Sequence, residues 1–283
     1  MIGGRNKPSL MSLLPSTRLS AARLALLSLL LLGLGVACGS SSSAPASIVA
    51  IAASDAGFQV TGTLRIGFNT VSFHNGGTRS HGLTVARLRD GKTRDDYTAA
   101  LHSANPNSAT TLLYYFGGAA PVEPGSDARF TLELISGQYL LVSAVKGKEQ
   151  VDGPIGSFSP EPGSANTAAP KTDFEVRLDD THAIPAPDKA GPGLKTFKAF
   201  SAGPSLHALY IWKLPVGKSQ DDLLSWMRSD QSAPAPAQLL GGTGTLSVGE
   251  STWFSLTLSA GNYVATDAFV GQNEASATAF TVK

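Results

Sequence analysis

Two histidines stand at matching places in this chain, and imidazole is the side chain that proteins use most often to bind metals and to transfer protons near neutral pH. His81 and His207 are 126 positions apart, and His74 precedes the first of them by seven. Two nitrogens without a carboxylate cluster make a poor structural metal site, so His74, His81 and His207 are weak candidate metal ligands. The simpler hypothesis treats each histidine as a polar residue at the junction of a loop and a strand.

Catalytic motifs are missing from the sequence. It contains no Gly-x-Ser-x-Gly nucleophile elbow, no His-Glu-x-x-His zinc helix and no phosphate-binding loop. His102 and His182 are isolated, and the only cysteine, Cys38, lies near the N-terminus. We therefore predict no catalytic residue and a protein that is not an enzyme.

The three tryptophans could form a platform for a sugar or a protein partner. Trp212 belongs to a mostly apolar strand and Trp226 lies beside the apolar face of an expected helix, so packing is the simpler role. Trp253 is out of phase with Phe254 and is expected to face solvent, but one exposed tryptophan is not a platform. We predict that the set serves packing.

The N-terminal stretch carries a targeting signal. Residues 1–23 contain four basic residues and no acidic ones, and they are followed by an apolar run that ends at Ala37. This order is typical of a secretory signal. The run is shorter than the roughly 20 residues of a membrane-spanning helix. Gly35-Val36-Ala37-Cys38 resembles the lipobox of bacterial lipoproteins, although the expected leucine stands one place early, at Leu34. The alternatives are an ordinary signal peptide with a chance cysteine and an uncleaved anchor.

The lipoprotein hypothesis predicts a signal peptide over 1–38, a Ser-rich tether over 39–47 and an extracytoplasmic protein held at the cell membrane by lipidated Cys38. The chain has 22 basic and 21 acidic residues, and loss of the four basic residues in 1–38 leaves 18 basic residues and a formal charge of −3. Nucleic-acid binding usually requires a clustered basic surface, so no nucleic-acid partner is expected. The lipid predicts contact with the membrane, and the further partner is an unknown envelope protein or small ligand.

The rest of the chain is a duplication. Residues recur at an offset of 126 in one block and of 124 in the next, so two copies of one unit follow each other. The matched residues include Gly67 with Gly193, Gly77 with Gly203, His81 with His207, Leu88 with Leu214, Gly91 with Gly217, Gly117 with Gly241, Phe130 with Phe254, Leu132 with Leu256, Leu134 with Leu258 and Tyr139 with Tyr263. We predict a first domain over 48–159, a linker over 160–170 and a second domain over 171–283.

Each copy has the pattern of an all-β domain. Apolar and polar residues alternate over 130–134 and 254–258, which predicts strands with one face in a core and the other in water. Glycines then mark turns into strands that start at Tyr139 and Tyr263, and further strands are expected over 83–88 and 209–214.

One helix interrupts the β pattern of each copy. Thr93 and Ser219 are good N-caps, and each is followed by two aspartates, Asp95-Asp96 and Asp221-Asp222, where carboxylates meet free amides and the positive end of the helix dipole. The aspartate pairs could be acid–base catalysts. We interpret them as caps, because the same order of residues appears twice at the start of a helix.

These features together resemble the cupredoxin-like fold, most closely small copper-domain-like modules of exported bacterial proteins. The resembling segments are Asn75 to His81, Gly91-Lys92-Thr93, Gly117-Gly118, Glu123-Pro124-Gly125, Phe130 and Gly137-Gln138-Tyr139, and in the second copy Ser201 to His207, Gly217-Lys218-Ser219, Gly241-Gly242, Ser247-Val248-Gly249, Phe254 and Gly261-Asn262-Tyr263. The resemblance covers nearly all of 48–283. It implies two tandem Greek-key β-sandwiches of cupredoxin-like type, each with one short inserted helix.

The resemblance also shows what has been lost. Copper-binding members hold the metal with two histidines, a cysteine thiolate and commonly a weak axial methionine. His81 and His207 match the first histidine, but Ser143 and Asp267 stand where the resemblance places the cysteine. The closing segments 145–158 and 269–280 contain neither histidine nor methionine. We therefore predict no type 1 copper and no cofactor.

The resemblance leaves a vestigial site in each copy. Asp267 shares the face of Tyr263 by the period of two along a strand, so we predict contacts of His207 with Asp267 and of His81 with Ser143. The favoured function is a non-enzymatic, lipid-anchored binding or interaction protein built from two metal-free domains. The alternative is a metal-handling or redox protein that uses a histidine site other than type 1 copper.

Overall fold

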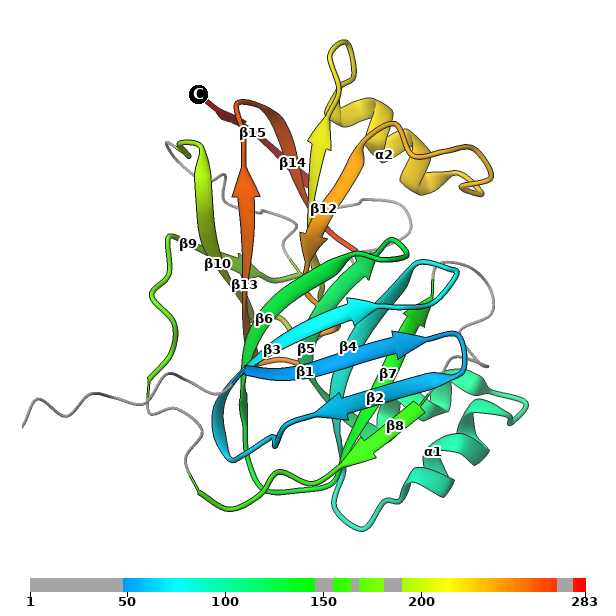
Figure 1. Ribbon diagram of the computed structural model, residues 1–283. Coiled ribbons are helices and arrows are strands. Elements are labelled where there is room, and N and C mark those ends of the chain that lie inside the picture. The colour runs from blue at the N-terminus through cyan, green and yellow to red at the C-terminus, as the bar shows by residue number, and fades with distance from the viewer. Residues whose placement is uncertain (1–47, 146–154, 164–167, 181–189, 269–276) are drawn as a thin grey trace, which may run out of the picture. The chain divides into compact units, whose positions relative to one another are not determined.

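The computed structural model describes residues 48–145, 155–163, 168–180, 190–268 and 277–283 (Figure 1). Cys38, the signal segment 1–38, the tether 39–47 and His182 lie outside these residues. Most of the regular structure in the described chain is strand, as predicted, and the strands form two β-sandwiches, one from each copy. Among the helices in these ranges, none is long and apolar enough to cross a membrane.

The first sandwich consists of two four-stranded groups that face each other. One group has the order β2-β1-β3-β6, and the other has the order β5-β4-β7-β8. The strands are β1 (Ile48–Ser54), β2 (Gly57–Thr61), β3 (Gly67–Asn75), β4 (His81–Leu88), β5 (Leu113–Val122), β6 (Asp127–Leu134), β7 (Tyr139–Val145) and β8 (Ile155–Phe158). The chain changes sheet between β3 and β4, between β5 and β6 and again between β6 and β7, so both sheets contribute to one core.

The second sandwich repeats this plan with one strand fewer among the described residues. Strands β9, β10 and β13 face the sheet of order β12-β11-β14-β15. The strands are β9 (Phe174–Leu178), β10 (Gly193–Ser201), β11 (Leu209–Leu214), β12 (Gln238–Gly242), β13 (Ser251–Leu258), β14 (Gly261–Asp267) and β15 (Ala277–Val282).

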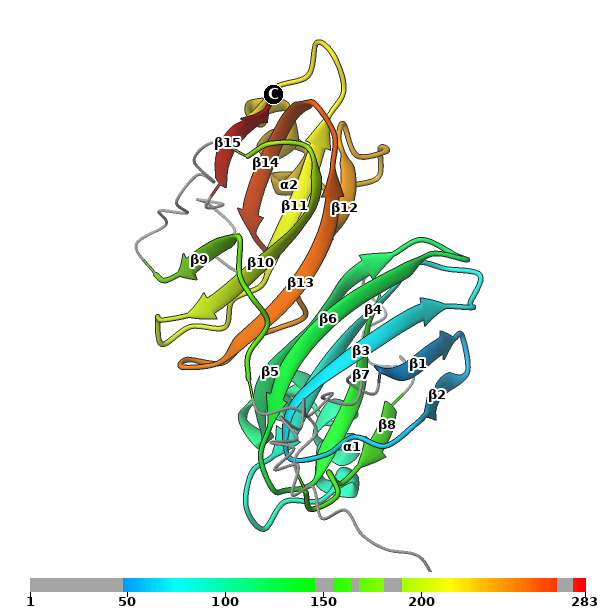
Figure 2. The same ribbon diagram turned by 60° about the vertical axis from the view of Figure 1, so that its left-hand side comes forward.

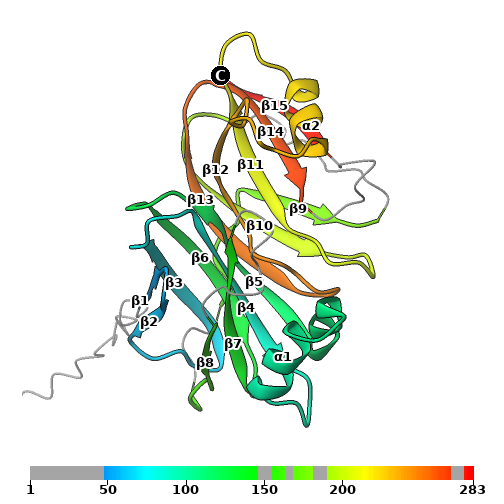
Figure 3. The same cartoon turned by 90° about the vertical axis from the view of Figure 1, so that its right-hand side faces the viewer.

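The inserted helices start where the sequence predicts them. In α1 (Arg94–Leu101), Thr93 and Asp96 form a capping box, and in α2 (Gln220–Arg228) Ser219 and Asp222 form another. Bonds from the capping residues lower the pKa of both carboxyls. A short 3-10 helix, η1 (Pro106–Leu112), follows α1 and was not predicted. Figure 3 shows α1 beside the sheet of β4 and β7, and α2 beside the sheet of β11 and β14.

The two sandwiches share one sheet, which the sequence did not predict. Strand β6 pairs antiparallel with β13, so the order runs β2-β1-β3-β6-β13-β10-β9 through both copies (Figure 2). Phe130 lies opposite Phe254, its own equivalent in the repeat. A strand that pairs with its equivalent in this way defines a local two-fold relation between the copies. One hydrophobic cluster contains Phe130 and Phe254 together with core residues of both sandwiches.

Candidate functional site

His81 is completely buried at the start of β4 and is hydrogen-bonded at both ring nitrogens. Its Nδ1 lies 3.0 Å from Ser143 Oγ on β7, and its Nε2 lies 2.9 Å from Asp55 Oδ1 after β1. A carboxylate only accepts, so Nε2 donates to Asp55, while the hydroxyl of Ser143 can donate to Nδ1 or accept from it. Hydrogen bonds hold the pKa of Asp55 well below its ordinary value. The bond from His81 has the largest effect, and the bonds from the Thr78 hydroxyl and amide add to it.

His207 occupies the same place in the second sandwich with different partners. Its Nδ1 donates to Asp267 Oδ2 at 2.6 Å, and the Ala208 amide donates to Asp267 Oδ1 at 3.2 Å. Both side chains of the pair are buried. The Nε2 lies 3.3 Å from Asp180 Oδ1, but this contact lacks hydrogen-bond geometry, so Nε2 has no hydrogen-bond partner among the described residues.

A repeated glycine stands against each histidine network. A Cβ at Gly77 would lie 2.7 Å from His81 Nε2 and 2.8 Å from Asp55 Oδ1. A Cβ at Gly203 would lie 2.8 Å from Asp180 Oδ1 and 2.9 Å from the Asp180 backbone nitrogen. Such separations are too short for packed atoms, so these glycines recur because the backbone approaches the aspartate closely.

Both predicted contacts are present, and two further partners of the histidines were missed. The structure brings His81 to Ser143 and His207 to Asp267, as period-two reasoning predicted. Asp55 and Asp180 were missed because they precede the blocks in which the repeat is clear. A signal was available, since each aspartate follows the first strand of its copy, 26 or 27 residues before the histidine.

The other predicted candidates lie apart from these networks. His74 lies on β3 with an exposed side chain and contacts Asp127 on β6 at 2.9 Å. It is therefore no partner of His81. His102 is the exposed C-cap of α1.

The donor atoms at the histidines do not fit type 1 copper. Beside the two imidazoles lie a hydroxyl and a carboxylate, and neither is the thiolate on which type 1 copper chemistry depends. Ligand atoms about 2.0–2.2 Å from a tetrahedral metal lie about 3.4 Å from one another, farther apart than the atoms of the three hydrogen-bonded pairs at His81 and His207. Within the described residues, no group of three or more His, Cys, Asp or Glu side chains is arranged to hold a metal ion.

The expectation that Trp253 faces solvent was wrong. The side chain is buried, lies edge-on to Phe68 of the first sandwich at 5.5 Å and donates from Nε1 to Thr172 Oγ1. The shared sheet is the reason, because pairing of β13 with β6 covers a face that an isolated domain would expose to water. Trp212 and Trp226 are also buried and lie edge-on to each other at 6.0 Å.

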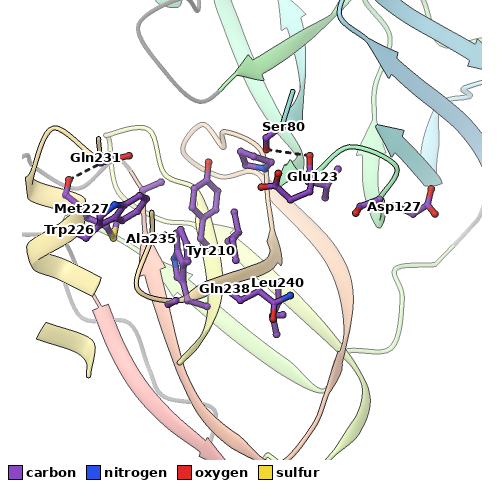
Figure 4. Close-up of a pocket in the computed structure, with 17 residues that line it drawn as sticks. Ser80, Glu123, Asp127, Tyr210, Trp226, Met227, Gln231, Ala235, Gln238 and Leu240 are labelled. Carbon is purple, nitrogen blue, oxygen red and sulfur yellow. Dashed lines mark hydrogen bonds between the residues drawn. The ribbon is translucent and has the colours of Figure 1, made fainter. Parts of the chain in front are cut away.

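A pocket of about 720 Å³ lies between the two sandwiches (Figure 4). Its lining residues are Ser80, Pro121, Val122, Glu123, Ser126 and Asp127 of the first sandwich and Tyr210, Trp212, Trp226, Met227, Gln231, Ala235, Ala237, Gln238, Leu239, Leu240 and Ala268 of the second. Ser80 directly precedes His81, and Ala268 directly follows Asp267, so the pocket borders both histidine networks.

The walls of the pocket differ in chemistry. Glu123 and Asp127 come from the first sandwich and are exposed, whereas the second contributes Tyr210, Trp212 and Trp226. No basic side chain is among the described residues that line the pocket. Burial, and to a smaller extent the charge of Asp267, raises the pKa of Tyr210 to about 12, so this phenol is neutral at physiological pH.

The other edge of the interface is closed by hydrogen bonds. Gly117 N donates to Thr245 O at 2.8 Å, and Ser247 N donates to Tyr115 O at 2.9 Å. The Thr245 amide also donates to Thr84 Oγ1, and Thr252 Oγ1 donates to Phe116 O at 2.8 Å. Thr245 and Thr252 thus tie the second sandwich to β5 along this edge, and Thr245 also contacts Thr84 on β4.

The repeat relates the closed edge to a second edge of the interface, where equivalent hydrogen bonds would be expected. The pocket lies at this second edge. The equivalent of Thr84 is Tyr210, a large ring in place of a small acceptor. Pro121 replaces Thr245 and has no N–H, and Ala128 replaces Thr252 and has no hydroxyl. Among the described residues, no backbone bond joins β12 to segment 121–123. The pocket therefore results from sequence differences between the two copies.

Comparisons with known proteins give structural matches only. No protein-family profile and no curated protein matches the chain. A multicopper oxidase crystal structure matches with 12% identity and a TM-score of 0.25, covering 83% of this chain and 88% of that one. A Roseiflexus castenholzii auracyanin matches with 17% identity and a TM-score of 0.30, covering 41% of this chain and 99% of its own, and a Nitrosomonas europaea copper nitrite reductase matches with 13% identity and a TM-score of 0.25, covering 84% and 94%. TM-scores this low do not establish a shared fold. The assignment of two β-sandwiches therefore rests on the strand pairing observed in this chain.

Proposed function

We propose that this chain is a non-enzymatic, lipid-anchored extracytoplasmic binding protein, built from two metal-free domains of cupredoxin-like type, and that its ligand binds in the pocket between them. The pocket itself is the observation that carries the proposal. Its volume of about 720 Å³ falls within the range of roughly 300–1,000 Å³ typical of small-molecule sites. Both copies contribute to its walls, which gives the duplication a function that one copy could not perform.

The chemistry at the histidines supports binding without a metal. His81 has both nitrogens engaged, and His207 has its Nδ1 engaged with Asp267. These bonds use three of the four ring nitrogens of the two histidines, and Ser143 and Asp267 stand where the resemblance places the thiolate. The imidazoles therefore serve as buried polar connections beneath the pocket.

Burial argues against hydrolysis. Asp55, His81 and Ser143 include the three side-chain types of a serine hydrolase triad. Ser143 is only 2% exposed and His81 is fully buried, so no substrate carbonyl reaches the hydroxyl. A nucleophile must be accessible within hydrogen-bond reach of its base, and this one is not.

The test uses the full chain, purified from membranes in a non-ionic detergent. Thermal unfolding is followed with a panel of amino acids, sugars, fatty acids and organic amines. We expect at least one class to raise the midpoint, and Leu240→Trp to abolish that rise by filling the pocket. Leu194→Trp is the matched control, because Leu194 is 69% exposed and outside the pocket.

Two further measurements complete the test. Metal analysis should find less than one copper or zinc per chain. Copper or zinc at close to one per domain, lost in His81→Ala, would overturn the metal-free proposal in favour of metal handling. Cys38→Ala should release the protein from the membrane fraction, and retention of the variant there would contradict lipid anchoring through Cys38.

A further inference from the structure

We infer that the pocket binds a small organic cation, an alkylammonium group that carries an apolar substituent. This inference rests on the proposed binding function and specifies its ligand class. Three observations carry it: the charge of the lining, the aromatic wall and the use already made of the indole N–H groups.

The charge of the lining selects a cation. Glu123 and Asp127 both come from the first sandwich, and no Lys, Arg or His is among the described residues that line the pocket. Asp127 contacts His74, which lies outside the lining, and no ion pair involves Glu123 within the described part of the chain. Complementary charge favours one class of ligand and repels the opposite one, so an anion is disfavoured here.

The wall opposite Glu123 is aromatic. Tyr210 lies edge-on to Trp212 at 6.4 Å, and Trp212 lies edge-on to Trp226 at 6.0 Å. Each ring is turned by 62° to 70° from the next, so their faces point in different directions. A cation within about 6 Å of an aromatic face is attracted by the ring quadrupole, and quaternary ammonium groups are recognised in this way.

The indole N–H groups are used within the protein. Trp212 Nε1 donates to Thr266 Oγ1 at 3.0 Å, and Trp226 Nε1 donates to the Ala233 carbonyl at 2.7 Å. These two donors are used within the protein, so the indole N–H groups do not compete with a cation for the aromatic wall. Leu239, Leu240 and Met227 continue the wall and fit an apolar substituent.

Figure 4 shows Tyr210 between Glu123 and the apolar wall that includes Trp226 and Met227. The ring of Tyr210 extends toward the Ser80 and Glu123 side of the pocket, whereas Trp226 and Met227 lie on α2. A cationic head placed between Glu123 and the ring of Tyr210 would contact a carboxylate on one side and an aromatic surface on the other. Its substituent would lie along the apolar wall.

The experiment compares probes of one shape and different charge. The cation is benzyl(2-hydroxyethyl)dimethylammonium, the neutral probe is its carbon isostere 3,3-dimethyl-4-phenylbutan-1-ol, and the anion is 3,3-dimethyl-4-phenylbutanoate. Binding to the full chain is measured by titration calorimetry. We expect the cation to bind at least tenfold more tightly than the neutral isostere and the anion to bind most weakly.

Variants separate charge from shape. Glu123→Gln should weaken binding of the cation about tenfold and leave the neutral isostere unchanged. Asp90→Asn is the matched control, because this carboxylate is 97% exposed and outside the pocket. Equal binding of cation and neutral isostere, preference for the anion, or no binding of any probe would overturn the inference. The proposed binding function survives those results if another class of the panel still binds in a manner that Leu240→Trp abolishes.

Discussion

The two copies have the same framework and differ at the edge where they meet. On one edge, Thr84, Thr245 and Thr252 close the interface with hydrogen bonds. On the other, their equivalents are Tyr210, Pro121 and Ala128, and a pocket remains. Duplication alone yields two equal edges, so a few later substitutions suffice to keep one edge closed by hydrogen bonds and to leave the other open.

The histidine networks differ in the same way. His81 contacts a hydroxyl on β7, whereas His207 contacts a buried carboxylate on β14. Ser143 lies opposite Leu83 and Asp267 lies opposite Leu209, so the two partners occupy equivalent places in the register. The position therefore requires a side chain that can hydrogen-bond a buried imidazole, and it tolerates either a neutral or a charged one.

The largest expected effect concerns the charged network. Asp267→Ala should lower the free energy of unfolding by about 3–5 kcal/mol, because it removes one member of a buried pair and leaves His207 and the Ala208 amide without their acceptor. Ser143→Ala should cost about 1–2 kcal/mol, since a neutral hydroxyl is lost. Denaturant unfolding measures both. Equal losses would show that the charge of Asp267 is irrelevant to stability.

The next effect compares equivalent glycines at the two edges. A Cβ at Gly117 would lie 1.8 Å from Thr252 Oγ1, and the φ of +91° is already unfavourable for alanine. Gly117→Ala should therefore cost about 3 kcal/mol or more. At Gly241, with a φ of +149°, a Cβ would meet only Leu256 Cδ2 at 2.9 Å, the end of a flexible side chain. Gly241→Ala should cost about 1–2 kcal/mol in the same assay, and a larger cost there than at Gly117 would contradict a tighter closed edge.

A smaller effect tests one bond of the closed edge. Thr252→Val keeps the shape of the side chain and removes the hydroxyl that donates to Phe116 O, so we expect a loss of about 1 kcal/mol. Ligand binding at the other edge should stay unchanged in calorimetry. Weaker binding in this variant would show that the closed edge and the pocket are coupled.

The smallest effect is a change in pH dependence. The folded-state pKa of Asp55 lies below its ordinary value of 3.8, so its stabilising contribution is complete above that pH and is lost as the pH falls below it. Asp55→Asn should make the fall in stability below about pH 4 shallower, measured by thermal unfolding. Thr78→Val removes one of the bonds to this carboxylate and should give an intermediate slope. Identical slopes in all three proteins would contradict the role of Asp55.

Local features of the fold could be predicted because they depend on nearby residues. The caps at Thr93 and Ser219 require only the three residues that follow them, and both capping boxes are present. The contact of His207 with Asp267 followed from the period of two along one strand.

Features that depend on the second copy could not be predicted. The pattern around Phe130 and Phe254 marks a face for the core, but it does not say which strand edge pairs with which. The burial of Trp253 and the pocket beside Tyr210 both follow from that pairing. The sequence shows Pro121 in place of Thr245. That this change removes a hydrogen bond between the copies becomes clear only once the interface is known.

The pairing of Phe130 with Phe254 has a consequence for the ancestry of the chain. A single copy would end its sheet at β6 with unpaired amides and carbonyls, an edge open to another molecule. Because this edge is complementary to its own equivalent, such a copy would form a symmetric homodimer with two identical clefts. Because both copies belong to one polypeptide, their association is independent of concentration. A single chain also allows the two clefts to diverge, which no symmetric dimer of identical subunits can do.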